Sequence, residues 1–124
     1  MSAVTVMVRD YDEAIEFFTR SLGLHLIADQ PRDGDERFVV VGAGSGADLL
    51  LARAATAEER DLVGRQTAGR VGFILRAADF FCEHRRMVEA GVVFEEEPRY
   101  ESYGTVAVFS DLYGNRWDLI QPHD

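Results

Sequence analysis

The sequence contains very little cysteine. Cys82 is the only one among 124 residues, so no disulfide bond can form within the chain. No apolar run approaches the roughly 18 residues that a membrane-spanning helix needs. Residues 1–5 show neither the basic start nor the apolar stretch of a secretory signal peptide. These absences favour a cytoplasmic protein without a membrane segment.

Basic residues are scarce relative to acidic ones. There are 13 Lys and Arg residues against 22 Asp and Glu residues, which gives a formal net charge of -9. A surface of this sign repels phosphate groups, which argues against nucleic acids and anionic membranes as partners. The charge is compatible with a cationic ligand, but solubility alone explains it as well.

The apolar content is sufficient for one core. Hydrophobic residues make up 47% of the chain and charged residues 28%, a balance typical of a soluble globular protein. A chain of 124 residues fits one domain better than two. We therefore expect a single domain over residues 1–124.

The first half of the chain shows a strand, a helix and three further strands. Residues 4–8 form an apolar strand pattern, and Asp10 with Glu13 has the spacing of a capping box at the start of a helix. An apolar stripe follows, and Gly23 stands where a left-handed residue ends a helix. The remaining strands are expected at residues 24–28, 37–41 and 48–52.

The second half repeats this order after a polar connector. We expect module one at residues 1–53, the connector at 54–69 and module two at 70–121. With an offset of 67, Val8-Arg9 matches Leu75-Arg76, and with an offset of 70, Asp48-Leu49-Leu50 matches Asp118-Leu119-Ile120. Matching elements in the same order indicate duplication, with two βαβββ modules in an α+β fold.

Three stretches resemble the vicinal oxygen chelate superfamily, the group of glyoxalases, bleomycin-resistance proteins and extradiol dioxygenases. They are residues 8–23, residues 89–98 and the closing segment 109–119, which contains Asp111-Leu112-Tyr113-Gly114-Asn115. The family's usual closing hairpin has proline where Leu112 stands. The resemblance implies that each module curls into half of a cup and that the two halves enclose a cleft as a half-barrel.

Metal-dependent members of this superfamily hold a divalent cation with His and Glu from the first and last strands of each module. The corresponding places here are Ala3, Asp48, Arg70 and Asp118. Ala3 offers no electron pair and Arg70 is a permanent cation. Two aspartates with water could hold Mg²⁺ loosely, which is a poor match to the family's site. We expect no metal cofactor, with Arg70 between Asp48 and Asp118, neutralising both.

Other candidate groups lack the partners that chemistry would need. His25, His84 and His123 share no ligand spacing with one another or with cysteine. The glycine-rich segment 42–46 runs from strand to strand, so we interpret it as a hairpin loop rather than a phosphate-binding loop. Cys82 has Arg85 and Arg86 one helical turn away, but we expect it to be a small buried apolar residue.

Aromatic residues are better candidates for a ligand site. Phe38, Tyr100, Tyr103, Phe109 and Trp117 fall on strands or loops that should face or rim the cleft. Because neighbours on a strand alternate, Trp117 should pack beneath the helices if Asp118 faces the cleft. We expect residues 99–104 to form a ligand-gating loop.

These observations favour a metal-independent binding protein resembling the bleomycin-resistance branch. The predicted site comprises Phe38, Asp48, Arg70, Tyr100, Tyr103 and Asp118. It would hold a small aromatic or cationic molecule, and the family habit implies a homodimer. One alternative is a metal-dependent lyase, isomerase or dioxygenase of the same superfamily, and another is an auxiliary domain with a vestigial cleft.

Overall fold

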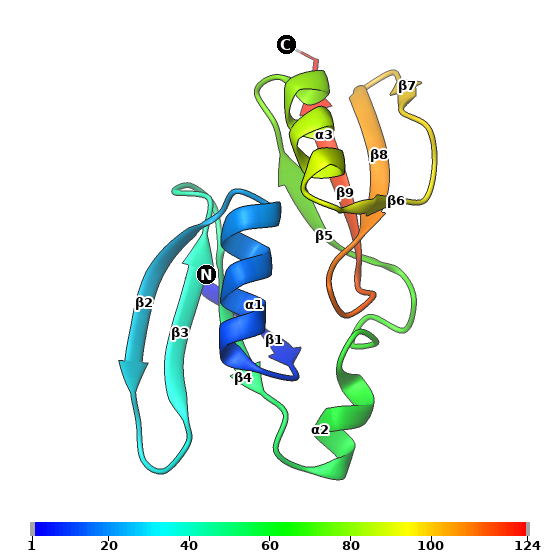
Figure 1. Ribbon diagram of the computed structural model, residues 1–124. Helices are drawn as coiled ribbons and strands as arrows, with labels where there is room; N and C mark the ends of the chain where they lie inside the picture. Colours follow the sequence, from blue (N-terminus) through cyan, green and yellow to red (C-terminus); the bar gives the residue numbers. More distant parts are fainter. Residues whose placement is uncertain (1, 124) are drawn as a thin grey trace. The chain divides into compact units, whose positions relative to one another are not determined.

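The computed structural model describes residues 2–123 and divides the chain into two compact units, Met1–Gln66 and Thr67–Asp124 (Figure 1). The division falls inside the predicted connector, 54–69. The connector forms helix α2 (Ala57–Leu62), and Gln66, after this helix, bonds to the first strand of the same unit. The Gln66 side chain accepts a hydrogen bond from Met7 N and donates one to Thr5 O, both at 2.9 Å.

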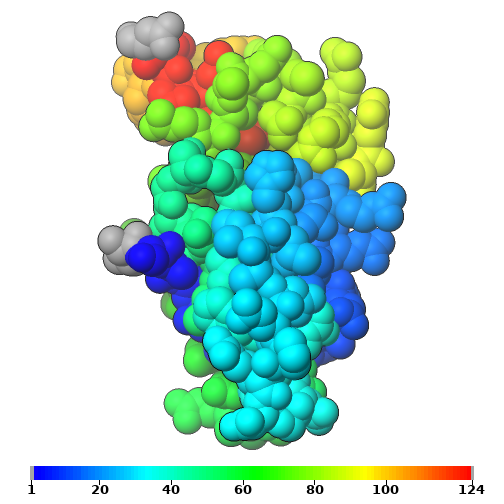
Figure 2. All heavy atoms as spheres, turned by 90° about the vertical axis from the view of Figure 1, so that its left-hand side faces the viewer, coloured from blue at the N-terminus to red at the C-terminus, as the bar shows by residue number. Residues whose placement is uncertain are grey.

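Before α2, the first unit forms a four-stranded sheet with the helix α1, as the sequence predicts. Its strands lie in the order β1-β4-β3-β2, with β1 parallel to β4 and the other pairs antiparallel. In Figure 2, β2 and the turn after it (blue to cyan) lie at the surface. The elements are β1 (Ala3–Val8), α1 (Tyr11–Glu16), β2 (His25–Pro31), β3 (Arg37–Gly42) and β4 (Asp48–Arg53).

The predicted capping and apolar stripe account for the first helix. Asp10 Oδ2 accepts a hydrogen bond from Glu13 N at 2.9 Å, which satisfies one of the free amides of the first turn. Ala14 and Phe18 are fully buried on the stripe. The helix widens into a π-helical turn, Phe17–Ser21, before Gly23 reverses the chain at φ 75°.

The second unit repeats the plan with an additional short strand. Its sheet has the order β5-β9-β8-β6, with β7 also paired to β8, and β5 runs parallel to β9. The elements are β5 (Val71–Arg76), α3 (Phe80–Glu89), β6 (Val93–Phe94), β7 (Arg99–Glu101), β8 (Gly104–Ser110) and β9 (Arg116–Pro122). No helix among residues 2–123 is long and apolar enough to cross a bilayer.

The closing hairpin of the second unit is organised by one buried carboxylate. Asp111 accepts hydrogen bonds from Tyr113 N, Asn115 N, Asn115 Nδ2 and Trp117 Nε1, at 2.9 to 3.1 Å. Gly114 takes a φ of 95°, so the turn forms without the family's proline. Trp117 is 3% exposed and stacks on Phe73 at 4.7 Å between ring centroids, as predicted for the helix side of the sheet.

Two predictions made for individual segments are wrong. Residues 99–104 do not form an open loop, because Arg99–Glu101 pair with β8 in a tight hairpin. Cys82 is exposed rather than buried, since it lies on the outer side of α3 while Phe80 and Met87 face the core. The glycine-rich segment 42–46 joins β3 to β4 as the predicted hairpin loop.

Candidate functional site

The second sheet has one face packed against α3 and one face without a helix. Strand alternation divides its residues: Trp117 and Leu119 are buried on the α3 side, and Asp118 points to the other side. Ile74 is paired with Asp118 in register and remains 69% exposed. We call this surface, defined by Ile74, Asp118 and Ile120, the open face of the second sheet.

Asp118 lies in an unusual position for a carboxylate. Its Oδ1 atom is buried and has no hydrogen-bond partner among the described residues. Burial raises the pKa of Asp118, because a charged carboxylate loses water contacts there, and the Glu96 carboxylate acts in the same direction. The guanidinium groups of Arg99 and Arg116 oppose this change, but the net direction is upward.

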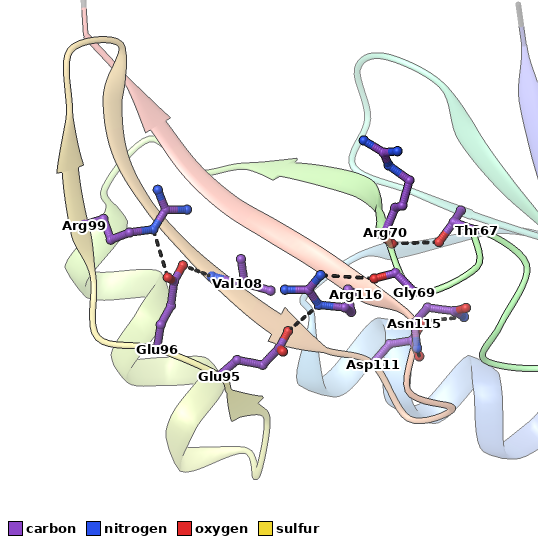
Figure 3. A network of polar contacts seen from close by, with 10 residues as sticks. All are labelled: Thr67, Gly69, Arg70, Glu95, Glu96, Arg99, Val108, Asp111, Asn115 and Arg116. Carbon is purple, nitrogen blue, oxygen red and sulfur yellow. Dashed lines mark hydrogen bonds and ion pairs between the residues drawn. The ribbon is translucent and has the colours of Figure 1, made fainter.

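Arg99 is held over the open face by two carboxylates. Its Nε donates to Glu96 at 2.8 Å (Figure 3), and its Nη1 donates to Glu101 at 2.7 Å. These bonds, with a further one to the Tyr103 side chain, raise the pKa of Arg99, so it remains a cation. Glu96 also accepts the amide of Val108 at 2.9 Å, which ties Arg99 to the centre of the sheet.

Arg116 is fixed on the other side of Asp118. Its Nε donates to Glu95 at 2.8 Å, and its Nη1 donates to the Gly69 carbonyl at 3.1 Å (Figure 3). Arg116 and Asp118 are two residues apart on β9, so both side chains leave the same face of the sheet. On the open face, the Asp118 carboxylate therefore lies between the guanidinium groups of Arg99 and Arg116, each of which is held by its own hydrogen bonds.

The first sheet also has a face away from its helix. Val40 is paired with Leu50, so Phe38 and Asp48, each two residues earlier, lie on that same face. The Asp48 carboxylate lies over Gly42, where any Cβ atom would collide with it. The Arg32 guanidinium covers the Phe38 ring at 4.9 Å from the ring centroid. This face belongs to the first unit, as the open face belongs to the second.

The predicted ion pair between Arg70 and Asp118 is not formed among the described residues. Arg70 is exposed, and its guanidinium points away from Arg116 in Figure 3. The register explains this, because Ile74 lies opposite Asp118 and Arg70 precedes Ile74 by four residues. The cations that do act on Asp118 are Arg99 and Arg116.

The register also corrects the equivalence of Asp48 and Asp118. Val41 pairs with Leu49 in the first closing hairpin and Phe109 pairs with Trp117 in the second, so Leu50 rather than Asp48 is the counterpart of Asp118. Asp48 instead pairs with Ala3 at the start of its strand. The offset of 70 fails because these two hairpins are equally long and lie 68 residues apart in the sequence.

The two predicted tyrosines separate. Tyr100 pairs with Thr105 and is 77% exposed, on the side of the sheet where Gln121 receives the first amide of α3. Tyr103 is in the hairpin turn, where it reaches Arg99. The structure therefore brings Tyr103 to the open face and leaves Tyr100 on the opposite one. The role of these residues in ligand binding stays a prediction.

The residues present do not fit the divalent metal of the metal-dependent relatives. Among residues 2–123, no three His, Cys, Asp or Glu side chains gather in a group that could hold a metal ion. Among the described residues, Asp118 is not grouped with the further donors that a divalent cation needs. Asp118 is therefore not assigned a metal ion.

Three residues of the open face are absent from the predicted site: Glu96, Arg99 and Arg116. The spacing of Arg116 from Asp118 on one strand was a sufficient signal for placing them on the same face. Arg99 requires the register of the β7–β8 hairpin, which appears once Glu101 is paired with Gly104. Glu96 carries no periodic signal, because it lies between two short strands.

The fold and the whole-chain comparison define the class of protein. The family model of the Glyoxalase/Bleomycin resistance protein/Dioxygenase superfamily matches residues 1–119. The chain belongs to this superfamily, and the α+β fold predicted from the resemblance is confirmed.

Individual relatives cover nearly all of the chain. It is 45% identical over 124 residues to an uncharacterized protein of Shewanella frigidimarina (strain NCIMB 400), covering 98% of this chain and 92% of the relative. Among solved structures, UcmS2 is 30% identical with a TM-score of 0.81, covering 97% of this chain and 96% of that one. TnmS3, an antibiotic binding protein from Streptomyces sp. CB03234, is 29% identical with a TM-score of 0.78, covering 99% and 95%.

Proposed function

We propose that the protein binds a small aromatic or cationic molecule without a metal ion, on the open face of the second sheet around Asp118 and Tyr103. The observation that carries this proposal is the buried Oδ1 of Asp118, which has no hydrogen-bond partner among residues 2–123. Native proteins satisfy almost all buried polar atoms, so an unsatisfied one on a face that no helix covers is typical of a ligand site.

The surroundings of Asp118 support an apolar body with a polar group. Ile74 offers a large exposed side chain in register with the carboxylate, and Tyr103 adds an exposed ring near Arg99. Aromatic and cation–π contacts contribute about 0.5–2 kcal/mol each, so a few of them suffice for micromolar affinity. TnmS3 is an antibiotic binding protein, and its similarity to this chain supports a ligand of the antibiotic class.

The test is calorimetric titration of the full chain, purified without chelator, with a panel of cationic, neutral and anionic aromatic compounds. We expect micromolar binding of at least one cationic aromatic compound, unchanged by EDTA. Calorimetry is preferable to Trp117 fluorescence, because Trp117 is buried on the opposite side of the sheet from Asp118. No binding across the panel would contradict the proposal.

Elemental analysis of the same sample tests the metal-dependent alternative. We expect less than about 0.1 equivalent of Ni, Zn, Mn or Fe, since the donors around Asp118 do not form a metal site. A stoichiometric metal whose removal abolishes binding would instead favour a lyase, isomerase or dioxygenase of the superfamily.

We further propose that the protein works as a cytoplasmic homodimer. The family resemblance supports the dimer, and the single cysteine supports a reducing compartment, where disulfides are rare. Light scattering coupled to size-exclusion chromatography should give a mass near twice the 13.9 kDa of one chain. A mass of one chain at micromolar concentration would contradict the dimer.

A further inference from the structure

The charges around Asp118 are not balanced. Arg99 is paired with Glu96 and Glu101, and Arg116 is paired with Glu95. Two cations therefore face three carboxylates before Asp118 is counted. With Asp118 ionised, the group of six side chains carries a net charge of −2, so its field favours a cation over an anion.

Neither arginine donates a hydrogen bond to Oδ1 of Asp118. Each already donates from Nε, the least mobile guanidinium nitrogen, to a glutamate at 2.8 Å. Arg116 uses a further N–H on the Gly69 carbonyl, and Arg99 uses one on Glu101. Oδ1 of Asp118 remains without a donor although two guanidinium groups are near enough to affect it.

We propose that Asp118 determines ligand specificity by accepting a hydrogen bond at Oδ1 from a protonated amine whose apolar body lies on Ile74 and Ile120. This inference rests on the proposed function and deepens it, since it assigns the ligand class to ammonium compounds. Arg99 and Arg116 are positioning residues in this scheme, because they fix the carboxylate without contacting the amine.

An ammonium group is suited to this place for a geometric reason. It carries three donors in a compact head, so one can reach an oxygen at the base of an apolar surface while the attached body covers that surface. A hydrogen bond to a charged acceptor is stronger than one between neutral groups, particularly away from water. A carboxylate on the same body would meet the net negative charge and be excluded.

Three probes with one apolar body test the inference on the full chain: 1-naphthylmethylamine, 1-naphthalenemethanol and 1-naphthoate. Calorimetry at pH 7 should show that the amine binds about tenfold more tightly than the alcohol, with naphthoate weakest. The Asp118→Asn variant should bind the amine about tenfold more weakly than the unmodified chain does, and its affinity for the alcohol should not change. It should therefore bind the two probes equally. Circular dichroism and thermal unfolding establish that the variant is folded.

A matched control removes one negative charge from the same unit at another place. Glu97→Gln changes an exposed residue beside Glu96 and should keep the preference for the amine within about twofold. Equal loss in Glu97→Gln and Asp118→Asn would overturn the inference in favour of a general charge effect. An unchanged preference in Asp118→Asn would also overturn it, while binding of the naphthalene body would leave the proposed function standing. No binding of any probe to the unmodified chain would count against the proposed function itself.

Discussion

Two aspartates of the closing hairpin, seven residues apart, show opposite physical states. Asp111 is buried and accepts hydrogen bonds from backbone amides, an amide side chain and an indole. Asp118 has a buried oxygen with no donor. A satisfied buried carboxylate stabilises the fold, and an unsatisfied one destabilises it. The same residue type therefore serves structure at one position and, we infer, ligand selection at the other.

Asp111→Ala should lower the free energy of unfolding by about 3 kcal/mol, because it leaves several buried donors of the turn without an acceptor. Urea unfolding followed by circular dichroism measures the change. Asp35→Ala, on the exposed turn before β3, should change stability by less than about 0.5 kcal/mol. A loss for Asp111→Ala as small as that of the control would show that solvent replaces these bonds.

Asp118→Asn should raise the melting temperature at pH 7 by about 2–4 °C. The pKa of Asp118 is raised in the folded state, so the unfolded chain ionises first as pH rises from about 3.9, and stability falls until the folded carboxyl has ionised as well. The variant cannot ionise at this position and escapes that loss. The difference in melting temperature should therefore vanish toward pH 3.5 and be full above the folded pKa. Scanning calorimetry from pH 3.5 to 8 measures it, and a variant less stable than the unmodified protein at pH 7 would contradict the argument.

At the scale of elements, one backbone amide of β8 donates to a side chain rather than to a neighbouring strand. β6 pairs with β8 at Phe109 and Ser110, and β7 pairs with it at Gly104, Thr105 and Val106. Between these pairs, Glu95 N donates to Val108 O at 2.9 Å, and the Glu96 side chain supplies the acceptor for Val108 N. One carboxylate thus joins the β7 hairpin, the centre of the sheet and Arg99.

Glu96→Ala should speed hydrogen exchange of the Val108 amide at least tenfold, since its acceptor is lost. Exchange at Val106, a residue that pairs with Arg99 in the β7–β8 ladder, should change much less. Amide exchange measured by NMR distinguishes the two sites. Equal protection of the Val108 amide in the variant and the unmodified protein would mean that the backbone of residues 95–98, rather than the Glu96 side chain, shields this amide.

The sequence was sufficient to predict most elements, because caps and apolar periodicity act locally. Asp10, Gly23 and Asp111 each show their structural role in the pattern around them. The pairing register was not predictable in the same way, since it depends on contacts between strands distant in the sequence, and a matching Asp-Leu pair at 48 and 118 suggested the wrong one. The register also decides the site. Arg70 is not paired with Asp118 among the described residues, and the cations that act on Asp118 are Arg99 and Arg116.

At the scale of the whole molecule, the negative charge is shared by both units. Residues 1–66 carry 7 arginines and 12 acidic residues, and residues 67–124 carry 6 arginines and 10 acidic residues, so the units contribute −5 and −4. The sequence has no lysine, and every side chain that is permanently cationic is a guanidinium. Several of these are held in ion pairs, such as Arg37 with Asp12 and Asp29. An approaching cation therefore meets a field of one sign from either unit.

This field makes amine binding sensitive to salt in a way that separates it from the local hydrogen bond at Asp118. The Debye length falls from about 30 Å at 0.01 M salt to about 8 Å at 0.15 M, so added salt screens the distant carboxylates and leaves a contact at hydrogen-bond distance nearly intact. The dissociation constant of 1-naphthylmethylamine should rise about threefold between 10 and 150 mM NaCl, and that of 1-naphthalenemethanol should stay constant. Asp118→Asn should retain part of the amine's salt dependence, because the rest of the net charge of -9 remains. A salt response shared by amine and alcohol would assign the effect to the protein's conformation, and no response in either would show that Asp118 and its immediate neighbours act alone.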